Sequence, residues 1–284
     1  MPGTRTHQGS PESVALGENM AHNFFDLTGC NAVVTGGSRG LGRSMALALA
    51  RAGACVVVTS RERNHCEETL ELIRRYEGTA SAETLDVRSE ESITAFGERM
   101  RCELGRVDIL VNNAGCNIRK AVTEITWEDW STVVDTNLRG TFFVTKALVP
   151  GMIEQRYGRV INIGSVTSVF GYAGVVPYCA SRGGVLQMTK AMADEFGPRG
   201  VTVNCLAPGW FNTEQTKTLY ENPEWVAYLI DRIPLRRPGQ AHDLDGAVVF
   251  LSSQAAEYVS GQILLVDGGI TTGSTRATPG GGEC

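Results

Sequence analysis

Short runs of β-branched and apolar residues alternate with longer amphipathic segments along most of this chain, from residue 30 to residue 266. Strands that are apolar on both faces and are separated by helices are typical of a parallel sheet covered on both sides. Right-handed crossovers between such strands give a doubly wound sheet. The alternation therefore predicts an α/β fold with a doubly wound parallel sheet of about seven strands and helices on both faces.

The composition of the segments places them along the chain. Strands are expected at residues 31–35, 54–59, 81–87, 107–112, 159–163, 201–206 and 263–266. Helices are expected at residues 41–52, 64–76, 90–104, 127–155, 177–197 and 243–252, with an irregular segment between residues 206 and 243. No internal repeat or low-complexity linker divides this pattern, so we expect a single domain over residues 25–270.

The two ends of the chain differ from this pattern. Residues 1–24 are polar and lack the apolar centre of a signal peptide, so we expect a disordered extension. Residues 271–284 are expected to form a flexible tail. No apolar run approaches the roughly 20 residues of a membrane-spanning helix, and a cytoplasmic protein is expected.

Charge and composition restrict the classes of partner. The net charge of −5 argues against a nucleic-acid or membrane partner, because both need a basic surface. The eight cysteines include no C-x-x-C pair, which favours a reducing compartment over a disulfide framework. The four histidines lack metal-ligand spacing, so no metal site is expected. A small-molecule substrate is therefore the expected partner.

A glycine-rich turn follows the first expected strand and precedes the first expected helix. It reads Thr-Gly-Gly-Ser-Arg-Gly-Leu-Gly over residues 35–42. Gly36, Gly40 and Gly42 allow a tight turn and a close approach of the backbone to a pyrophosphate, whose charge the helix N-terminus would bind. In this position the turn predicts a dinucleotide-binding site.

The turn has the spacing T-G-x-x-x-G-x-G, and further motifs follow it in a fixed order. They are Asp86-Val87, Asn112-Asn113-Ala114-Gly115, Asn137, Ser165, Tyr178, Pro208-Gly209 and Val266-Asp267-Gly268-Gly269. Over about residues 25–270 the ordered set resembles the short-chain dehydrogenase/reductase (SDR) family. The resemblance implies a single-domain Rossmann fold and an oxidoreductase that interconverts an alcohol and a ketone.

The resemblance also implies a set of cofactor-binding residues. They are Gly36, Ser38, Arg39, Gly40, Leu41, Gly42, Ser60, Arg61, Asp86, Val87, Asn113, Ala114, Gly115, Tyr178, Arg182, Pro208, Gly209 and Thr213. Within this set, Asp86 and Val87 would flank the adenine, and Thr213 would reach the carboxamide of the nicotinamide.

The end of the second expected strand indicates which nicotinamide cofactor is preferred. An acidic residue there binds the ribose hydroxyls, whereas a basic residue attracts a 2′-phosphate. Here Ser60 stands where NAD-preferring relatives carry an acid, and Arg61 follows it. Together with Arg39 in the glycine-rich turn, these residues predict a preference for NADP(H), with NAD(H) left open as a second cofactor.

Carbonyl reduction needs a proton donor at the developing alkoxide and polar groups that hold the oxygen. The resemblance implies that Ser165 positions this oxygen, that Tyr178 transfers the proton and that Asn137 holds a water of the proton relay. A phenol needs a neighbouring positive charge to work near neutral pH. The family usually supplies a lysine four residues after the tyrosine, whereas this chain has Arg182.

Arg182 leaves three interpretations open. Arginine keeps the positive charge and can hydrogen-bond the nicotinamide ribose, which favours an active enzyme. It does not readily release a proton into a relay, which would give a weakened enzyme or one with an altered pH optimum. The third interpretation is an NADP-binding protein without turnover.

Substrate choice in such a fold lies in the segments at the carboxyl ends of the strands. Residues 117–119, 208–216 and 231–234 are similar to those of gluconate 5-dehydrogenases and 2-deoxy-gluconate dehydrogenases. The candidate substrate residues are Asn117, Arg119, Ser165, Trp210 and Glu214, and Arg119 or Arg232 would pair with a carboxylate. A sugar acid or polyol is expected, and a broad-specificity ketone or 3-oxoacyl reductase is the alternative. Each residue taken singly could instead brace a loop.

The two longest helical segments carry apolar residues around much of their circumference. The residues concerned are Phe142, Phe143, Val144, Val185, Leu186, Met188 and Met192. In a single domain some of this surface would be exposed, so we expect burial against a second copy of the chain. Relatives of this kind are commonly tetramers, and a homo-oligomer, either a tetramer or a dimer, is expected.

Overall fold

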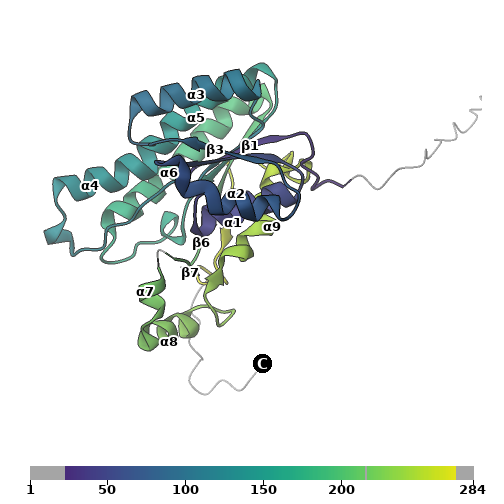
Figure 1. Cartoon of the computed structure of the whole chain (residues 1–284). Helices are drawn as coiled ribbons and strands as arrows, with labels where there is room; N and C mark the ends of the chain where they lie inside the picture. Colours follow the sequence, from purple (N-terminus) through teal and green to yellow (C-terminus); the bar gives the residue numbers. More distant parts are fainter. Residues whose placement is uncertain (1–22, 215, 273–284) are drawn as a thin grey trace, which may run out of the picture.

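A computed structural model of the chain describes residues 23–214 and 216–272, and its centre is a seven-stranded parallel sheet (Figure 1). The strand order is β3-β2-β1-β4-β5-β6-β9. The strands are β1 (Asn31–Val34), β2 (Cys55–Ser60), β3 (Ala80–Thr84), β4 (Ile109–Asn112), β5 (Gly158–Ile163), β6 (Val201–Pro208) and β9 (Ile263–Val266). The fold class expected from the sequence is confirmed.

Helices cover both faces of the sheet (Figure 1). One apolar core lies under α1 (Gly40–Arg51), α2 (Glu67–Arg74) and α9 (Asp245–Ser252). The other lies under α3 (Glu90–Leu104), α5 (Gly140–Glu154) and α6 (Val176–Phe196). The strands between these layers are apolar on both faces, and every residue of β5 is buried.

The direction of winding reverses between β1 and β4. Chain order runs outward from β1 through β2 to β3, and in the opposite direction from β4 to β9. In open α/β sheets the crevice for a ligand lies outside the carboxyl ends of the strands at such a reversal. The glycine-rich turn after β1 and the Asn112–Gly115 segment after β4 therefore meet where a dinucleotide is expected.

The expected helix over residues 127–155 is not uniform. It consists of α4 (Trp127–Val134), a π-helical turn over Asp135–Arg139 and then α5. The turn includes Asn137, which is fully buried. A π-turn accommodates one extra residue and is frequently found at functional sites. The 3.6-residue apolar pattern alone does not reveal such an insertion.

The segment expected to be irregular between residues 206 and 243 contains regular elements. Strands β7 (Phe211–Asn212) and β8 (Gly239–Gln240) pair in parallel. Between them lie the short helix α7 (Lys217–Tyr220) and the ten-residue helix α8 (Pro223–Arg232). Asn222 caps α8 and Pro223 is its first residue, which is a helix-start signal that the sequence interpretation missed.

The chain itself buries most of the apolar residues on which self-association was predicted. Val144, Val185, Leu186 and Met192 lie in the cores, whereas Phe142 is 41% exposed. Further large apolar side chains are exposed on α4, where Trp127 is 87% exposed. Self-association stays a prediction. The exposed apolar residues Phe142 and Trp127, and no longer the buried ones, are what supports it.

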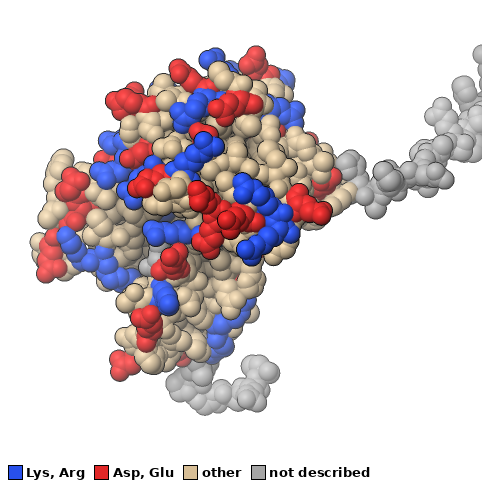
Figure 2. Space-filling model, in the orientation of Figure 1, with Lys and Arg blue, Asp and Glu red and all other residues tan. Residues whose placement is uncertain are grey.

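The expected extension and tail fall largely outside the described residues. Residues 1–22 and 273–284 are not described, and the backbone carbonyl of Phe24 accepts a hydrogen bond from the Ala255 amide. Among the residues described, no helix is both long and apolar enough to cross a membrane. Acidic and basic side chains are interspersed over the face of the molecule in Figure 2. Among the described residues, Arg43 forms an ion pair with Glu68 and Arg99 forms one with Glu83.

Candidate active site

The glycine-rich turn between β1 and α1 is held against the segment that follows β4. Thr35 Oγ1 accepts hydrogen bonds from the backbone amides of Asn113 and Ala114, at 2.9 and 3.0 Å. Asn113 Nδ2 donates to the carbonyls of Thr35 and Gly36, at 2.9 and 3.0 Å. These four bonds fix the distance between the two loops.

Glycines are required in this turn because the loops approach closely. A Cβ on Gly42 would lie 2.4 Å from Asn113 Nδ2, and one on Gly36 would lie 3.0 Å from Ala114 Cα. Gly36 and Gly40 also have φ of +62° and +56°, the left-handed region that glycine adopts without strain. In the described structure the side chain of Arg39, the residue before α1, does not cap the helix, which leaves its first N–H groups available to a pyrophosphate.

Two residues outside the predicted set brace the same turn. Arg43 Nη2 donates to the Ser38 carbonyl at 2.6 Å, and the Arg43 guanidinium forms a bidentate pair with Glu68 at 2.8 Å. Thr69 Oγ1 donates to the carbonyls of Gly37 and Ser38. No motif in the sequence marks Arg43 or Thr69, because the contact depends on how α2 packs on the turn.

The residues predicted to select the cofactor lie around the same turn. Ser60 ends β2 and is half-buried, and Arg61 directly after it is exposed. Arg39 is the residue that precedes α1 and is also exposed. Within the residues described, neither guanidinium pairs with a carboxylate, which leaves both available for a phosphate.

Asp86 and Val87 follow β3 in a tight turn. Asp86 Oδ1 accepts a hydrogen bond from the Arg88 amide at 2.9 Å, and the Asp86 amide donates to Ser92 Oγ at 2.9 Å. Val87 packs on the helix after the π-turn, where a Cβ on Gly140 would lie 2.7 Å from the Val87 carbonyl oxygen. Asp86 is thus fixed by its own turn, with the adenine role still a prediction.

Asn137 joins three parts of the candidate site through its side chain. Its Oδ1 accepts from the Cys116 amide at 2.8 Å, and its Nδ2 donates to the Cys116 carbonyl at 2.9 Å. The same Nδ2 donates to Ser181 Oγ at 3.1 Å. The side-chain amide is therefore occupied in fixing the loop after β4 to α6. The Asn137 backbone carbonyl accepts from Thr141 Oγ1 at 2.8 Å, so a relay water would have to use its second lone pair.

Ser165 and Tyr178 lie where a short 3₁₀ turn, η4 (Val166–Ser168), packs on the start of α6. Ser165 is 7% exposed, and its Oγ accepts from the Thr167 amide at 3.1 Å. Ser168 Oγ donates to the Arg182 carbonyl at 2.9 Å, which ties η4 to α6. Tyr178 is half-buried in the first turn of α6.

Arg182 lies one turn after Tyr178 and is 5% exposed. Its guanidinium carbon is 5.0 Å from the centre of the Tyr178 ring, and its Nη1 donates to the Ile163 carbonyl at 2.6 Å. A Cβ on Gly115 would lie 2.5 Å from Nη2. Arg182 Nε is buried without a hydrogen-bond partner in the described residues. This orphaned donor is the kind of group that a bound ligand satisfies.

The loop after β6 reaches back to the glycine-rich turn. Gly209 packs against Asp267 so closely that a Cβ would lie 2.7 Å from Asp267 Cα. Beyond it, Thr213 lies beside Gly40, with 3.9 Å between the Thr213 Cβ and a Cβ built on the glycine. Thr213 is itself fixed by Thr216, whose Oγ1 accepts from the Thr213 amide at 2.9 Å. Thr213 and Gly40 thus lie side by side.

A continuous series of ring contacts includes the predicted substrate residue Trp210, and we refer to it as the aromatic wall. It consists of Tyr172, Trp210, Trp225 and Tyr228. Neighbouring ring centroids are 5.0, 5.3 and 5.4 Å apart in this order. Guanidinium groups lie at both ends, with Arg119 5.6 Å from the Tyr172 ring and Arg232 4.5 Å from the Tyr228 ring.

Of the other predicted substrate residues, Asn117 and Glu214 are exposed and no side-chain hydrogen bond fixes either in the described residues. Trp210 is a member of the aromatic wall, and Arg119 adjoins it. The sequence interpretation missed Tyr172, Trp225 and Tyr228. Tyr172 precedes α6 whereas Trp225 and Tyr228 lie on α8, and only the fold brings these segments together.

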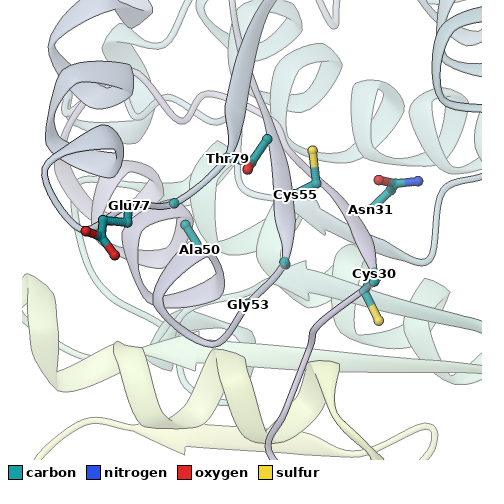
Figure 3. Close-up of a pocket in the computed structure, with 10 residues that line it drawn as sticks. Cys30, Asn31, Ala50, Gly53, Cys55, Glu77 and Thr79 are labelled. Atoms are coloured by element: carbon teal, nitrogen blue, oxygen red, sulfur yellow. The ribbon is translucent and has the colours of Figure 1, made fainter.

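Two hollows lie at the opposite edge of the sheet. One of about 220 Å³ opens at the amino ends of β1, β2 and β3. Figure 3 shows it, with the Cys30 and Cys55 sulfur atoms pointing away from each other. A neighbouring hollow of about 560 Å³ shares Gly53 with it. Both are remote from the carboxyl edge, so they do not belong to the candidate site.

The described geometry defines a class of protein. A dinucleotide-binding turn, a serine–tyrosine pair with a buried cation and an aromatic wall meet at one edge of a doubly wound sheet. A phenol beside a fixed cation can give a proton to an oxygen that a serine hydroxyl holds. The fold and site are those of an oxidoreductase that acts on alcohols and ketones.

Comparison with known proteins identifies the family. A model of the family described as enoyl-(acyl carrier protein) reductase matches residues 36–271. Gluconate 5-dehydrogenase of Gluconobacter oxydans is 40% identical over 253 residues, which cover 89% of this chain and 99% of the relative. The chain belongs to the short-chain dehydrogenase/reductase family, as its ordered motifs predicted.

Two further relatives differ in the activities that their names describe. A 3-oxoacyl-[acyl-carrier-protein] reductase of Pseudomonas aeruginosa is 39% identical over 246 residues, covering 87% of this chain and 99% of the relative. The crystal structure of a gluconate 5-dehydrogenase from Burkholderia cenocepacia, in complex with NADP and tartrate, is 36% identical with a TM-score of 0.85. It covers 88% of this chain and 98% of that one.

Proposed function

We propose that the protein is an NADP(H)-dependent reductase of the ketone group of a sugar acid, which also catalyses the reverse oxidation. The observation that carries the proposal is the Arg119 guanidinium beside the aromatic wall, on the loop that follows the Asn112–Gly115 segment. A guanidinium binds a carboxylate with two parallel hydrogen bonds. The gluconate 5-dehydrogenase of Burkholderia cenocepacia binds tartrate, a hydroxy acid, and supports this choice.

The roles of the reacting residues follow from their placement. Ser165 Oγ would hold the carbonyl oxygen, and the Tyr178 hydroxyl would give it the proton. Arg182, fixed by the Ile163 carbonyl, would stabilise the phenolate that remains. Asn137 would fix the loop after β4 and offer its backbone carbonyl to a relay water.

The residues present fit a dinucleotide. The uncapped start of α1, the glycines that approach Asn113, and the buried Nε of Arg182 would hold its pyrophosphate and its nicotinamide ribose. The remaining binding residues would be those named in the sequence set, from Gly36 to Thr213. When bound, the nicotinamide would supply the hydride. Arg39, Ser60 and Arg61 favour the 2′-phosphate form, and the relatives crystallised with NADP support this.

One alternative is a ketone or 3-oxoacyl reductase, which the relative from Pseudomonas aeruginosa favours. A 3-oxoacyl thioester carries no carboxylate next to its reacting chain, so Arg119 would have no partner there. A protein with weak or absent turnover is the other alternative, since Arg182 replaces the usual lysine. A cytoplasmic location, a homo-oligomer and a domain spanning residues 25–270 stay predictions beside these.

Steady-state kinetics with NADPH and NADH tests the proposal. The substrates would be 5-keto-D-gluconate, an uncharged keto sugar and a 3-oxoacyl thioester. We expect the highest kcat/KM for the keto acid with NADPH. Faster turnover of the thioester would favour the first alternative, and tight NADPH binding without turnover of any ketone would favour the second.

A further inference from the structure

Ser165 lies in the segment that leaves the sheet at the end of β5. The backbone amide of Thr167 donates to Ser165 Oγ at 3.1 Å. A serine oxygen has two lone pairs and one O–H, so this bond leaves the O–H available to a substrate oxygen. Catalytic groups act only when they are held in the reacting geometry. The use of the Ser165 hydroxyl therefore depends on what fixes its segment.

Gly164, which joins β5 to Ser165, is packed against the neighbouring strand β6. Its amide donates to the Leu206 carbonyl at 2.8 Å. A Cβ on Gly164 would lie 2.5 Å from Cys205 Sγ and 2.9 Å from Ser168 Oγ. The backbone at Gly164 thus lies between a buried thiol of the sheet and the hydroxyl of Ser168, with no room for a side chain.

Ser168 connects Ser165 to α6 through its hydroxyl group. The Ser165 amide donates to Ser168 Oγ at 3.2 Å, and the Ser168 amide donates to the Ser165 carbonyl at 2.8 Å. Ser168 Oγ in turn donates to the Arg182 carbonyl at 2.9 Å. Because α6 also carries Tyr178, one hydroxyl group fixes the backbone of Ser165 relative to the helix that presents the proposed proton donor.

The Arg182 side chain makes a second connection to the same segment. Its Nη1 donates at 2.6 Å to the carbonyl of Ile163, which precedes Ser165, whereas Ser168 follows the serine. Arg182 therefore binds the segment on both sides of Ser165, once through its guanidinium and once through its main chain. A lysine has a single terminal nitrogen, which cannot occupy the positions of Nη1 and Nη2 at the same time.

We propose that Ser168 is a positioning residue for Ser165, and that the Arg182 guanidinium shares this task. The two connections act in parallel, so either one alone partly holds the serine, and the loss of both releases it. The arginine that replaces the usual lysine thus has a role besides its charge. The inference rests on the proposed function, because it needs Ser165 Oγ to hold the reacting carbonyl oxygen.

The test removes the Ser168 hydroxyl and follows kcat. Ser168→Ala is compared with the parent in the reduction of 5-keto-D-gluconate by NADPH. We expect kcat to fall about 5- to 10-fold, which is the effect of losing one hydrogen bond in the transition state. The KM for NADPH should change by less than about twofold, because Ser168 lies outside the set of residues proposed to bind the dinucleotide.

Ser253→Ala is the matched control. Ser253 Oγ likewise accepts from a backbone amide, that of Ala255 at 3.2 Å, and donates to a backbone carbonyl, that of Phe250 at 2.9 Å. The residue is 1% exposed, and its carbonyl accepts from Arg159 Nε at the amino end of β5, far from the candidate site. Urea unfolding measures the stability of both variants, and only Ser168→Ala should lose kcat.

Two backgrounds separate positioning of the serine from a general loss of structure. In Ser165→Ala, the additional change Ser168→Ala should have no further effect on kcat, because the hydroxyl that Ser168 positions is absent. Single-turnover measurements at high enzyme concentration make these slow proteins measurable. In Arg182→Lys, Ser168→Ala should cost at least about fivefold more in kcat than it does in the parent, since both connections are then lost.

The outcomes distinguish the inference from the proposed function. An unchanged kcat in Ser168→Ala, an equal loss in Ser253→Ala, or a full further loss in the Ser165→Ala background overturns the inference alone. Equal losses in the parent and in Arg182→Lys overturn the share of the guanidinium. The same comparison of kcat holds for whichever ketone the parent reduces, so a better substrate than the keto acid overturns only the proposed substrate. A parent that binds NADPH and reduces no ketone overturns the proposed function and this inference with it.

Discussion

The guanidinium of Arg182 occupies the space that Gly115 leaves open, since a Cβ on this glycine would lie 2.5 Å from Nη2. The same Cβ would lie 3.1 Å from Asn137 Oδ1. The glycine that ends the Asn112–Gly115 motif thus makes room for the arginine that replaces the usual lysine of the family. The two residues are expected to depend on each other in kinetics.

Gly115→Ala should lower kcat/KM by at least about tenfold in the parent, because the new methyl group displaces the guanidinium from Tyr178. Lysine has no Nη2, so the loss should be clearly smaller in the Arg182→Lys background. Steady-state kinetics on the four proteins of this double-mutant cycle gives the coupling. An equal loss of kcat/KM in the parent and in the Arg182→Lys background would show that Gly115 and Arg182 act independently.

Removal of the cation tests whether Arg182 takes part in catalysis. Arg182→Met should lower kcat about 100-fold or more, which is the scale of general acid–base contributions. Arg182→Lys keeps the charge and should stay within about tenfold of the parent, with a changed pH–rate profile. Arg199→Met, in an exposed turn, is the control. Unaltered kcat in Arg182→Met would exclude an electrostatic role for Arg182.

Ser60→Asp tests the cofactor preference. A carboxylate at the end of β2 would repel a 2′-phosphate and accept hydrogen bonds from ribose hydroxyls. We expect kcat/KM with NADPH to fall about 10- to 100-fold, the effect of losing a hydrogen bond to a charged group, while kcat/KM with NADH is kept or rises. Arg101→Ala, an exposed arginine on α3, serves as the control. A parent that uses NADH better than NADPH would refute the assignment.

A buried polar ladder between β4 and α6 makes Asn162→Ala a test of stability. Asn162 Oδ1 accepts from Asn112 Nδ2 at 2.9 Å, and Asn162 Nδ2 donates to Thr189 Oγ1 at 3.0 Å. Both asparagines are at most 2% exposed, so alanine at residue 162 leaves buried polar groups unpaired. The free energy of unfolding should fall by about 2–3 kcal/mol.

Urea unfolding followed by circular dichroism measures this loss. Asn212→Ala, at an exposed asparagine of β7, should leave the free energy of unfolding nearly unchanged. A similar small change in Asn162→Ala would show that water replaces the missing amide. Activity should fall with stability in Asn162→Ala, because the ladder holds the strand that leads into the Asn112–Gly115 segment.

Asp129 predicts a pH dependence of stability. Lys120 Nζ lies 2.6 Å from its carboxylate, and this contact, together with the hydrogen bond from the Thr126 amide, lowers the pKa of Asp129 from 3.8 to about 2. A lowered pKa stabilises the folded state above pH 3.8, and this contribution is lost as the pH falls toward 2. The stability gap between the parent and Asp129→Asn should therefore narrow from pH 5 to pH 3. Glu98→Gln, exposed on α3, is the control, and a gap that widens would contradict the sign.

The sequence predicted the parts of the fold that local pattern determines. The seven strands, the glycine-rich turn and the family motifs each depend on residues that are neighbours in the chain. The π-turn around Asn137 was not predicted, because one extra residue barely disturbs an apolar pattern. The burial of Val185 and Met192 was not predicted either, since only the packed sheet decides which side of α6 it covers.

In the candidate site, too, the residues marked by sequence motifs were predicted and those brought together by packing were not. The ordered motifs marked Ser165, Tyr178 and Arg182, whereas Arg43 and Thr69 brace the glycine-rich turn without any motif. The aromatic wall could not be predicted, because it joins residues from two loops and α8. Asn222-Pro223 would have indicated the start of α8, and with it the side of the site on which Trp225 and Tyr228 lie.

The tryptophans of the aromatic wall also provide an intrinsic fluorescence signal at the candidate site. Of the four tryptophans of the chain, Trp210 and Trp225 belong to the wall, and Trp127 and Trp130 lie exposed on α4. Replacing the pair on α4 by phenylalanine would leave an enzyme whose ultraviolet emission arises at the substrate side alone. Ligand binding, or a displacement of α8, would then change the wavelength or the intensity of the tryptophan emission without any attached dye.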